Sequence, residues 1–319
     1  MLPQKLRDFA KEYISSLENQ SLPDGKKIVL APDEIQMLPA NRQKIGDIVL
    51  VSVPPALAHK KKEIGQLLLK MDSNVRLVLN DLGIEGQFRI PNREIIGISD
   101  ISGADADAAN RSSSAAAVNF HPGWLTETIH LENKCKFKLD AAKIMFSKGN
   151  LEEKRRISTL CAGETVVDMF AGIGYFSIPI AVYSRPARVI SIELNPISYH
   201  YLCENIRLNK VENIVEPVLG DCALVTPKEI ADRVLMGYVG TTHLYLNAGI
   251  LAIKSEGGIL HYHDTVPEKL FPSRPIQQIM DAAKECNRFA TILETRIIKK
   301  YSPGVYHVVI DAQISKVRR

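Results

Sequence analysis

The sequence predicts an α/β protein with a mostly parallel, doubly wound sheet that ends in an antiparallel hairpin, preceded by a smaller α+β domain. From residue 164 onward short apolar strands alternate with helices, which is the pattern of right-handed βαβ units. Two consecutive strands close this pattern and indicate the terminal hairpin. The chain has 319 residues, more than one small core needs, so we expect a division into domains.

The first part of the chain predicts a helical lead and then the smaller domain. Residues 1–40 contain a helix from Lys5 to Leu17, and residues 41–149 mix strands with the amphipathic helix "HKKKEIGQLLLKMD". Residues 99–117, "SDISGADADAANRSSSAAA", have few large side chains to bury, so we expect a flexible loop there.

The larger domain, residues 150–319, accounts for the main sheet. Its expected strands are "TVVDMF", "RVISIEL", "IVEPVLGD", "DRVLMGY" and "GGILHYHDTV", with "ETRIIKKYSP" and "VYHVVIDAQI" as the hairpin. Helices are expected at "PISYHYLCENIRLNKV", near 227–231, at "HLYLNAGILAI" and near 275–287. "TVVDMF" is almost wholly apolar, as a strand buried on both faces should be.

Composition restricts the class of protein. A hydrophobic content of 45% with 24% charged residues is ordinary for a globular protein, and no apolar run approaches the ~20 residues of a membrane span. Five cysteines without a C-x-x-C pair argue against structural zinc and a disulfide framework. Since the first residues also lack the apolar core of a signal peptide, we expect a cytoplasmic protein. A sequence pI of 8.7 permits nucleic-acid binding without demonstrating it.

The stretch "DMFAGIGYFSIPI" lies at the first turn from strand to helix. Gly172 and Gly174 let the backbone approach a ligand and adopt positive φ, and the next helix begins with free N–H groups. A dinucleotide-binding turn would carry a third glycine where Ser177 stands. Asp168 would repel a pyrophosphate, but it can serve the ammonium end of S-adenosylmethionine (SAM).

Two more acidic residues end the next two strands. Glu193 can hold both ribose hydroxyls of SAM, and Asp221 can accept a hydrogen bond from the adenine amino group. Either carboxylate alone could merely cap a helix, but their order after the glycine turn predicts a SAM site at the carboxyl edge of the sheet. Besides the three carboxylates, the residues predicted to line it are Phe170, Ala171, Gly172, Gly174, Phe176, Asn195 and Cys222.

The motifs around this turn resemble a family of tRNA enzymes that modify the purine 3′ of the anticodon. The resemblance rests on "FKLDAAKIMFSKGNLEEKRR", "VDMFAGIGYFSIP", "ELNP", "DRVLMGYV" and "KKYSPGVYHVV", and covers roughly residues 45–98 and 126–314. One branch of the family methylates guanosine 37 at a ring nitrogen. The other branch, in the wybutosine pathway, moves the 3-amino-3-carboxypropyl group of SAM to the tricyclic base derived from that guanosine.

The resemblance implies a class I, Rossmann-like SAM-dependent transferase domain and two more cofactor residues, Ser147 and Lys154. The ammonium of Lys154 suits the methionine carboxylate, although both residues could equally lie on a charged surface. The resemblance also implies that the smaller domain positions the anticodon arm of a tRNA, tRNA-Phe, and we expect a monomer. We expect no metal, because His261 and His263 in "HYHD" have no evident third ligand.

The segment "MGYVGTTH" after the fourth strand separates the two branches. Ring-nitrogen methyltransferases often place an Asn or Asp with prolines there, and this chain does not. The resemblance therefore favours the aminocarboxypropyl branch, in which orientation decides which carbon on sulfur is attacked. A proton must also leave the base, and His243 is the candidate acceptor unless it only caps the next helix.

The predicted reaction is transfer of the 3-amino-3-carboxypropyl group to C7 of 4-demethylwyosine at position 37 of tRNA(Phe), with release of methylthioadenosine. Two alternatives stay open. One is a SAM-dependent tRNA guanosine-37 methyltransferase, and the other is a non-catalytic protein that binds SAM and tRNA.

Overall fold

The computed structural model describes residues 2–17, 30–39, 41–86, 88–99, 123–146 and 149–316. Ser147 and the expected loop at 99–117, apart from Ser99, lie outside these residues. The chain divides into two compact units. The first comprises Met1–His130 and Lys138–Phe146, and the second comprises Leu131–Phe137 and Ser147–Arg319. The described residues of the N-terminal lead, 2–17 and 30–39, lie within the range of the first unit.

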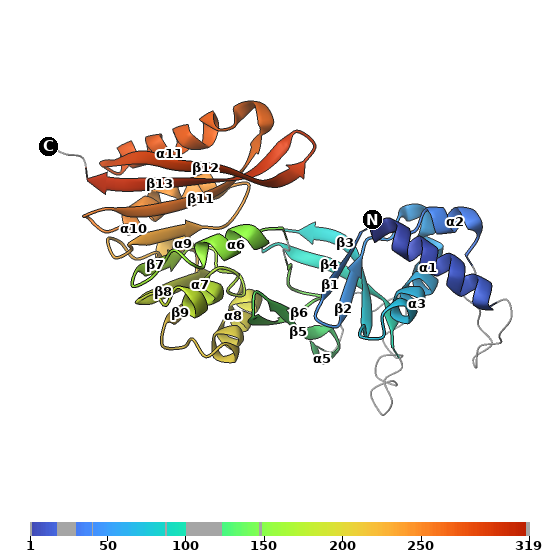
Figure 1. Ribbon diagram of the computed structural model, residues 1–319. Coiled ribbons are helices and arrows are strands. Elements are labelled where there is room, and N and C mark those ends of the chain that lie inside the picture. The colour runs from blue at the N-terminus through green and yellow to red at the C-terminus, as the bar shows by residue number, and fades with distance from the viewer. Residues whose placement is uncertain are drawn as a thin grey trace. The chain divides into compact units, whose positions relative to one another are not determined.

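The first unit is built on a four-stranded sheet in the order β1–β2–β3–β4 (Figure 1). Its strands are β1 (Arg42–Ile45), β2 (Ile48–Val51), β3 (Leu77–Glu85) and β4 (Ile90–Ile98). Its helices are α1 (Leu2–Leu17), α2 (Pro32–Gln36), the 3-10 helix η1 (Pro55–Lys60), α3 (Lys61–Met71) and α5 (Gly123–Thr126). β2 and β3 are parallel and joined through α3, whereas the other two pairs are antiparallel. The unit is therefore α+β, as the sequence predicts.

α3 packs through the apolar stripe that its sequence predicts. Ile64, Leu67 and Leu68 are fully buried and share one core with residues of β2 and β3. Leu6 and Ala10 of α1 join the same core. The leading helix therefore contributes to the stability of this unit.

The second unit contains a seven-stranded sheet in the order β12–β13–β11–β10–β7–β8–β9 (Figure 1). Its strands are β7 (Thr165–Asp168), β8 (Arg188–Glu193), β9 (Val215–Leu219), β10 (Arg233–Met236), β11 (Gly258–Pro267), β12 (Arg288–Ser302) and β13 (Val305–Lys316). The five strands β9, β8, β7, β10 and β11 are parallel, and β13 is antiparallel to both β11 and β12. The predicted parallel sheet with a terminal hairpin is confirmed.

Helical segments precede or connect the strands of this sheet. They are α6 (Leu151–Ile157), α7 (Ser177–Tyr183), α8 (Pro196–Leu208), α9 (Cys222–Val225), η2 (Thr242–Tyr245), α10 (Leu246–Ala252), η3 (Glu268–Leu270) and α11 (Ser273–Glu285). A helix near 227–231 was expected, and this prediction is wrong. The helix lies earlier, because the Asp221 side chain caps it and Pro227 disfavours helical backbone at the residue before it. Within the described part of the chain, no helix is long and apolar enough to cross a membrane.

Two helical layers cover the two faces of this sheet. Val166 and Leu235 face the core formed with α6, α7 and α8, whereas Val167, Val234 and Met236 face the core formed with α10 and α11. Neighbouring residues of one strand thus enter different cores, because side chains alternate along a strand. This double burial explains why the strands are apolar without alternation.

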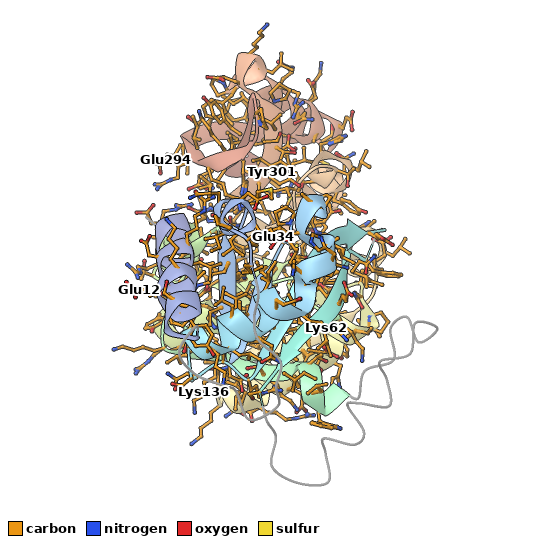
Figure 2. The ribbon with its side chains drawn as sticks, turned by 90° about the vertical axis from the view of Figure 1, so that its right-hand side faces the viewer. Glu12, Glu34, Lys62, Lys136, Glu294 and Tyr301 are labelled. Carbon is orange, nitrogen blue, oxygen red and sulfur yellow. The ribbon has the colours of Figure 1, made fainter. Side chains whose placement is uncertain are left out.

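A short hairpin, β5 (Glu127–Glu132) and β6 (Cys135–Asp140), is divided between the two units. At the other end of the chain, β12 is an edge strand of the large sheet. Glu294 and Tyr301 on this strand are exposed, and Figure 2 labels both.

The contact between α3 and β4 allows almost no space. A Cβ on Gly65 would lie 2.0 Å from the carbonyl oxygen of Ile96, and one on Gly97 would lie 2.8 Å from the backbone of Gly65. We expect Gly65→Ala to destabilise the first unit by about 1–3 kcal/mol, because backbone atoms cannot give way as a flexible side chain would. Fluorescence of Trp124, the single tryptophan, during urea unfolding measures this change.

Gln66→Ala is the matched control, since Gln66 is exposed on the same helix. Its unfolding free energy should stay within about 0.5 kcal/mol of the wild type. Equal stability of G65A and Q66A would show that the helix can move away from β4.

Candidate active site

The turn after β7 is organised around the carboxylate of Asp168. Its Oδ2 accepts a hydrogen bond from the Ser177 hydroxyl at 2.7 Å, and its Oδ1 accepts one from the N–H of Phe170 at 3.3 Å. The side chain is 0% exposed, and burial raises its pKa to about 6. In this structure the carboxylate therefore secures the turn to α7 and presents no surface to an ammonium group.

Gly172 and Gly174 adopt the backbone that this turn requires. Their φ angles are 59° and 97°, which residues with a side chain rarely adopt. A Cβ on Gly172 would also lie 2.7 Å from the ring of Tyr175. The positive φ predicted for the two glycines is therefore confirmed.

Ala171 and Phe176 attach the turn to the sheet. The N–H of Ala171 donates to the carbonyl of Ile192 at the end of β8, at 2.9 Å. Phe176 is 5% exposed and meets the ring of His263 edge-on, with centroids 5.5 Å apart. Phe176, predicted to line the cofactor, therefore supports the turn from the sheet side.

Glu193 faces the same turn from the end of β8. Its Oε2 accepts from the N–H of Gly172 and its Oε1 from the N–H of Asn195, each at 2.8 Å. Each oxygen keeps a second lone pair, so the carboxylate can still accept two hydroxyl donors. Asn195 in turn caps α8 by accepting from the N–H of Ile197 at 2.9 Å. The structure thus brings three predicted residues together in an arrangement that suits a ribose.

Asp221 and Cys222 lie at the end of the next strand, β9. Asp221 caps α9 by accepting from the N–H of Ala223 at 2.9 Å. A carboxylate accepts several donors, so the cap leaves room for an adenine amino group. Cys222 is buried, and burial raises the pKa of its thiol to about 12. It therefore remains protonated and offers an apolar surface.

Three aromatic rings stand where β7 and β10 end. Phe170 and Tyr238 stack with centroids 5.3 Å apart and planes at 20°, and Tyr245 meets Phe170 edge-on at 5.3 Å. Phe170 was predicted, whereas Tyr238 and Tyr245 were missed. Their letters were visible in "MGYVGTTHLY", but only the fold shows that these tyrosines share one cluster.

Lys154 lies near the turn but is paired within the protein. Its Nζ is 2.7 Å from Oε1 of Glu132, and it stands 5.1 Å from the centroid of the Tyr175 ring. Both side chains of the pair are buried, and burial lowers the pKa of Lys154. Glu132 carries no motif of its own, so the sequence analysis missed it.

His243 is exposed on η2, the short helix that also carries Tyr245. No side chain caps the start of α10. The alternative in which His243 caps this helix is therefore wrong.

The glycine turn, Glu193 and Asp221 lie at the ends of three neighbouring strands, β7, β8 and β9. The sequence also identifies the family to which the chain belongs. Residues 128–291 match the TRM5/TYW2 methyltransferase domain, and residues 26–97 match the TYW2 N-terminal domain. The chain belongs to the TRM5/TYW2 family. The predicted family is confirmed.

Relatives from both branches of the TRM5/TYW2 family are similar to this chain. The tRNA(Phe) (4-demethylwyosine(37)-C(7)) aminocarboxypropyltransferase of Methanocaldococcus jannaschii is 42% identical, over 86% of this chain and 98% of the relative. The tRNA (guanine(37)-N(1))-methyltransferase Trm5b of Pyrococcus abyssi is 34% identical, over 91% of this chain and 80% of the relative. The crystal structure of Pyrococcus horikoshii TYW2 in complex with MeSAdo has a TM-score of 0.75 at 35% identity, covering 96% of this chain and all (100%) of that one.

The two histidines of "HYHD" lie in the interior of this TRM5/TYW2 sheet. His261 is 2.6 Å from both Asp311 and Arg233, and His263 is 3.1 Å from His307. Both side chains are buried, and because they are two residues apart they lie on the same face of β11. Burial lowers the pKa of His263 to about 3, so it is neutral. Among the residues that the structure describes, no group of three or more His, Cys, Asp and Glu could hold a metal ion.

The Glu132–Lys154 pair yields a stability test. We expect Glu132→Gln to destabilise the second unit by about 3–5 kcal/mol at pH 7, because it leaves a buried ammonium unpaired. The loss should shrink toward pH 10, since a folded-state pKa lowered by burial lets Lys154 shed its proton and relieve the cost. Urea unfolding followed by circular dichroism across this pH range measures both effects.

Glu152→Gln is the control, because Glu152 is exposed on the same helix as Lys154. The double variant E132Q/K154M should recover most of the loss, since it removes the unpaired charge. A loss in E132Q that stays constant with pH would contradict the assignment of the cost to Lys154.

Proposed function

We propose that this protein transfers the 3-amino-3-carboxypropyl group of SAM to C7 of 4-demethylwyosine at position 37 of tRNA(Phe). The observation that carries the proposal is the segment after β10. It places Gly237 and Tyr238 where ring-nitrogen methyltransferases often carry an amide or carboxylate that holds the base, and Tyr238 is stacked on Phe170. The site can position a group donor, but it lacks the polar group for that methylation at this place.

The residues around the glycine turn fit SAM as the donor. Glu193 would accept the ribose hydroxyls, Asp221 the adenine amino group, and the open backbone at Gly172 would admit the methionyl part. Lys154, beside Tyr175, would have to leave its ion pair with Glu132 to meet the carboxylate of SAM. Ser147 belongs to the proposed site through the resemblance alone.

The reaction follows from the chemistry of the sulfonium. C7 of the base attacks Cγ of the methionyl chain, the Cγ–S bond breaks, and its electron pair stays on sulfur as methylthioadenosine leaves. The proton on C7 then passes to the imidazole of His243 and on to solvent. Orientation supplies most of this catalysis, because the sulfur needs no acid or base.

The relatives support the same assignment. The M. jannaschii relative carries this activity in its name and is more similar to the chain than the P. abyssi methyltransferase, at 42% against 34% identity. MeSAdo, the ligand of the P. horikoshii structure, stands for methylthioadenosine, the leaving group of Cγ transfer. Methylation of guanosine 37 is the second candidate, because the Trm5b relative matches 91% of the chain.

The same proposal covers the tRNA partner, the oligomeric state and the cellular compartment. The first unit would position the anticodon arm of the tRNA, and the enzyme would act as a monomer in the cytosol. The cysteines suit a reducing compartment, since Cys135, Cys161, Cys203, Cys222 and Cys286 are all free thiols.

SAM labelled separately in the methyl group and in the carboxyl carbon tests the reaction. With tRNA that carries 4-demethylwyosine, we expect the carboxyl label in the tRNA and methylthioadenosine in solution. With unmodified tRNA we expect neither label in the tRNA. Scintillation counting of the tRNA and chromatography of the nucleoside product give the result.

Methyl label entering unmodified tRNA, with S-adenosylhomocysteine released, would make the protein a guanosine methyltransferase. Binding of SAM and tRNA without any label transfer would make it a non-catalytic binding protein. Both results would overturn the proposal.

His243→Gln tests the proton acceptor. We expect the single-turnover rate to fall by about 100-fold or more, as for loss of a general base, with SAM affinity unchanged within about twofold. His200→Gln is the control, because His200 is exposed on α8 and has no proposed role. An H243Q rate equal to that of H200Q would exclude His243 as the acceptor.

A further inference from the structure

The cluster of Phe170, Tyr238 and Tyr245, hereafter the aromatic wall, stands at a special place in the sheet. Phe170 follows β7 and Tyr238 follows β10, two neighbouring parallel strands in which Asp168 pairs with Leu235. From β7 the chain moves outward to β8 and β9 before it returns to β10. Such a switch point is where open α/β sheets bind ligands, outside the carboxyl ends of the strands.

The aromatic wall adjoins the residues that we assign to SAM. Phe170 donates its N–H to Asp168 inside the turn. Tyr245 packs against the same core cluster as Cys222, the residue that follows Asp221 at the end of β9. The wall therefore spans from the glycine turn to the end of β9.

The rings are held in place but are not closed off. Phe170 and Tyr245 pack against the core on the α10 and α11 side. Gly237, next to Tyr238, lies so close to the turn that a Cβ there would be 2.9 Å from the Phe176 ring. All three rings of the wall are only partly buried, so part of each faces outward. Fixed ring faces at a ligand edge suit a cation.

We propose that the aromatic wall decides which carbon of SAM is transferred, by holding the sulfonium and its methyl group against the ring faces. This inference rests on the proposed function. With the methyl group against the wall, Cγ faces the base, so the Cγ–S bond breaks and methylthioadenosine leaves. With the methyl group turned to the base, the CH3–S bond would break instead and S-adenosylhomocysteine would leave. Tyr238 is the specificity residue, because it stands where methyltransferases carry the group that holds the base.

The first measurement is binding without tRNA. Isothermal titration compares SAM with S-adenosylhomocysteine, which keeps the same chain but lacks the methyl group and the charge. We expect Tyr238→Leu to weaken SAM binding by about five- to thirtyfold, as for loss of a cation–π contact. Its affinity for S-adenosylhomocysteine should change by less than about twofold, because a neutral sulfur gains little from a ring face.

The second measurement is the partition of label. With doubly labelled SAM and tRNA bearing 4-demethylwyosine, Y238L should raise the ratio of methyl to carboxyl label in the tRNA at least tenfold over wild type. Tyr238→Phe keeps the ring and should keep the wild-type ratio. Tyr301→Leu is the control for loss of a tyrosine from the same unit, since Tyr301 is exposed on β12.

The outcomes separate the two proposals. If Y238L weakened the binding of both ligands equally, or left the label ratio unchanged, the Tyr238 ring would serve only in packing. Either result would overturn the proposed role of the aromatic wall. Should Y238L not fold, Phe170→Leu takes its place with the same expectations. Methyl transfer by the wild type would overturn the proposed function, while the binding comparison would still decide whether the wall contacts the sulfonium.

Discussion

The architecture of the site depends on one carboxylate that is buried among neutral partners. Asp168 takes its hydrogen bonds from the Ser177 hydroxyl and a backbone N–H, and Ser191 extends the chain by donating to Ser177 at 2.7 Å. A pKa of about 6 means that the folded state binds the proton more tightly than the unfolded state. The stabilisation from protonated Asp168 is complete below the unfolded-state pKa and is lost as pH rises through about 6. The free energy of unfolding is then lower by about 3 kcal/mol at neutral pH. Burial of the ionised Asp168 carboxylate, which fixes the glycine turn, therefore lowers the stability of the folded protein at neutral pH.

A second buried network holds the sheet beside the site. Asp311 of β13 accepts from His261 of β11, and Arg156 of α6 bridges Asp311 to Glu153. Although burial alone would raise the pKa of Asp311, the bonds from His261 and Arg156 lower it to about 2. Its contribution to stability is therefore present above the unfolded pKa and is lost only as pH falls toward 2. The network ties α6, β11 and β13 together, and with them the strand ends on which the aromatic wall and His243 depend.

These two networks explain how the site can select a carbon with few reactive groups. In our proposal the described residues offer carboxylates that would hold the nucleoside, a lysine that is already paired, and rings that would lie against the sulfonium. Such a site acts by fixing orientation, which is effective only on a rigid frame. The buried polar groups supply this rigidity, because each loses a hydrogen bond if a strand end shifts.

The fold class, the order of the strands along the chain and the position of the glycine turn were determined by the sequence alone. They are local properties, since apolar periodicity and the positive φ of Gly172 and Gly174 depend on neighbouring residues. The misplaced helix at 227–231 was a local error, because the cap at Asp221 and the proline at 227 are both visible in the sequence. Only the tertiary structure decided that Lys154 pairs with Glu132, 22 positions away, and that both histidines of "HYHD" are buried. The tertiary structure also decided that the rings of the aromatic wall lie together. Rings distant in sequence meet only when parallel strands bring their ends to one edge of the sheet.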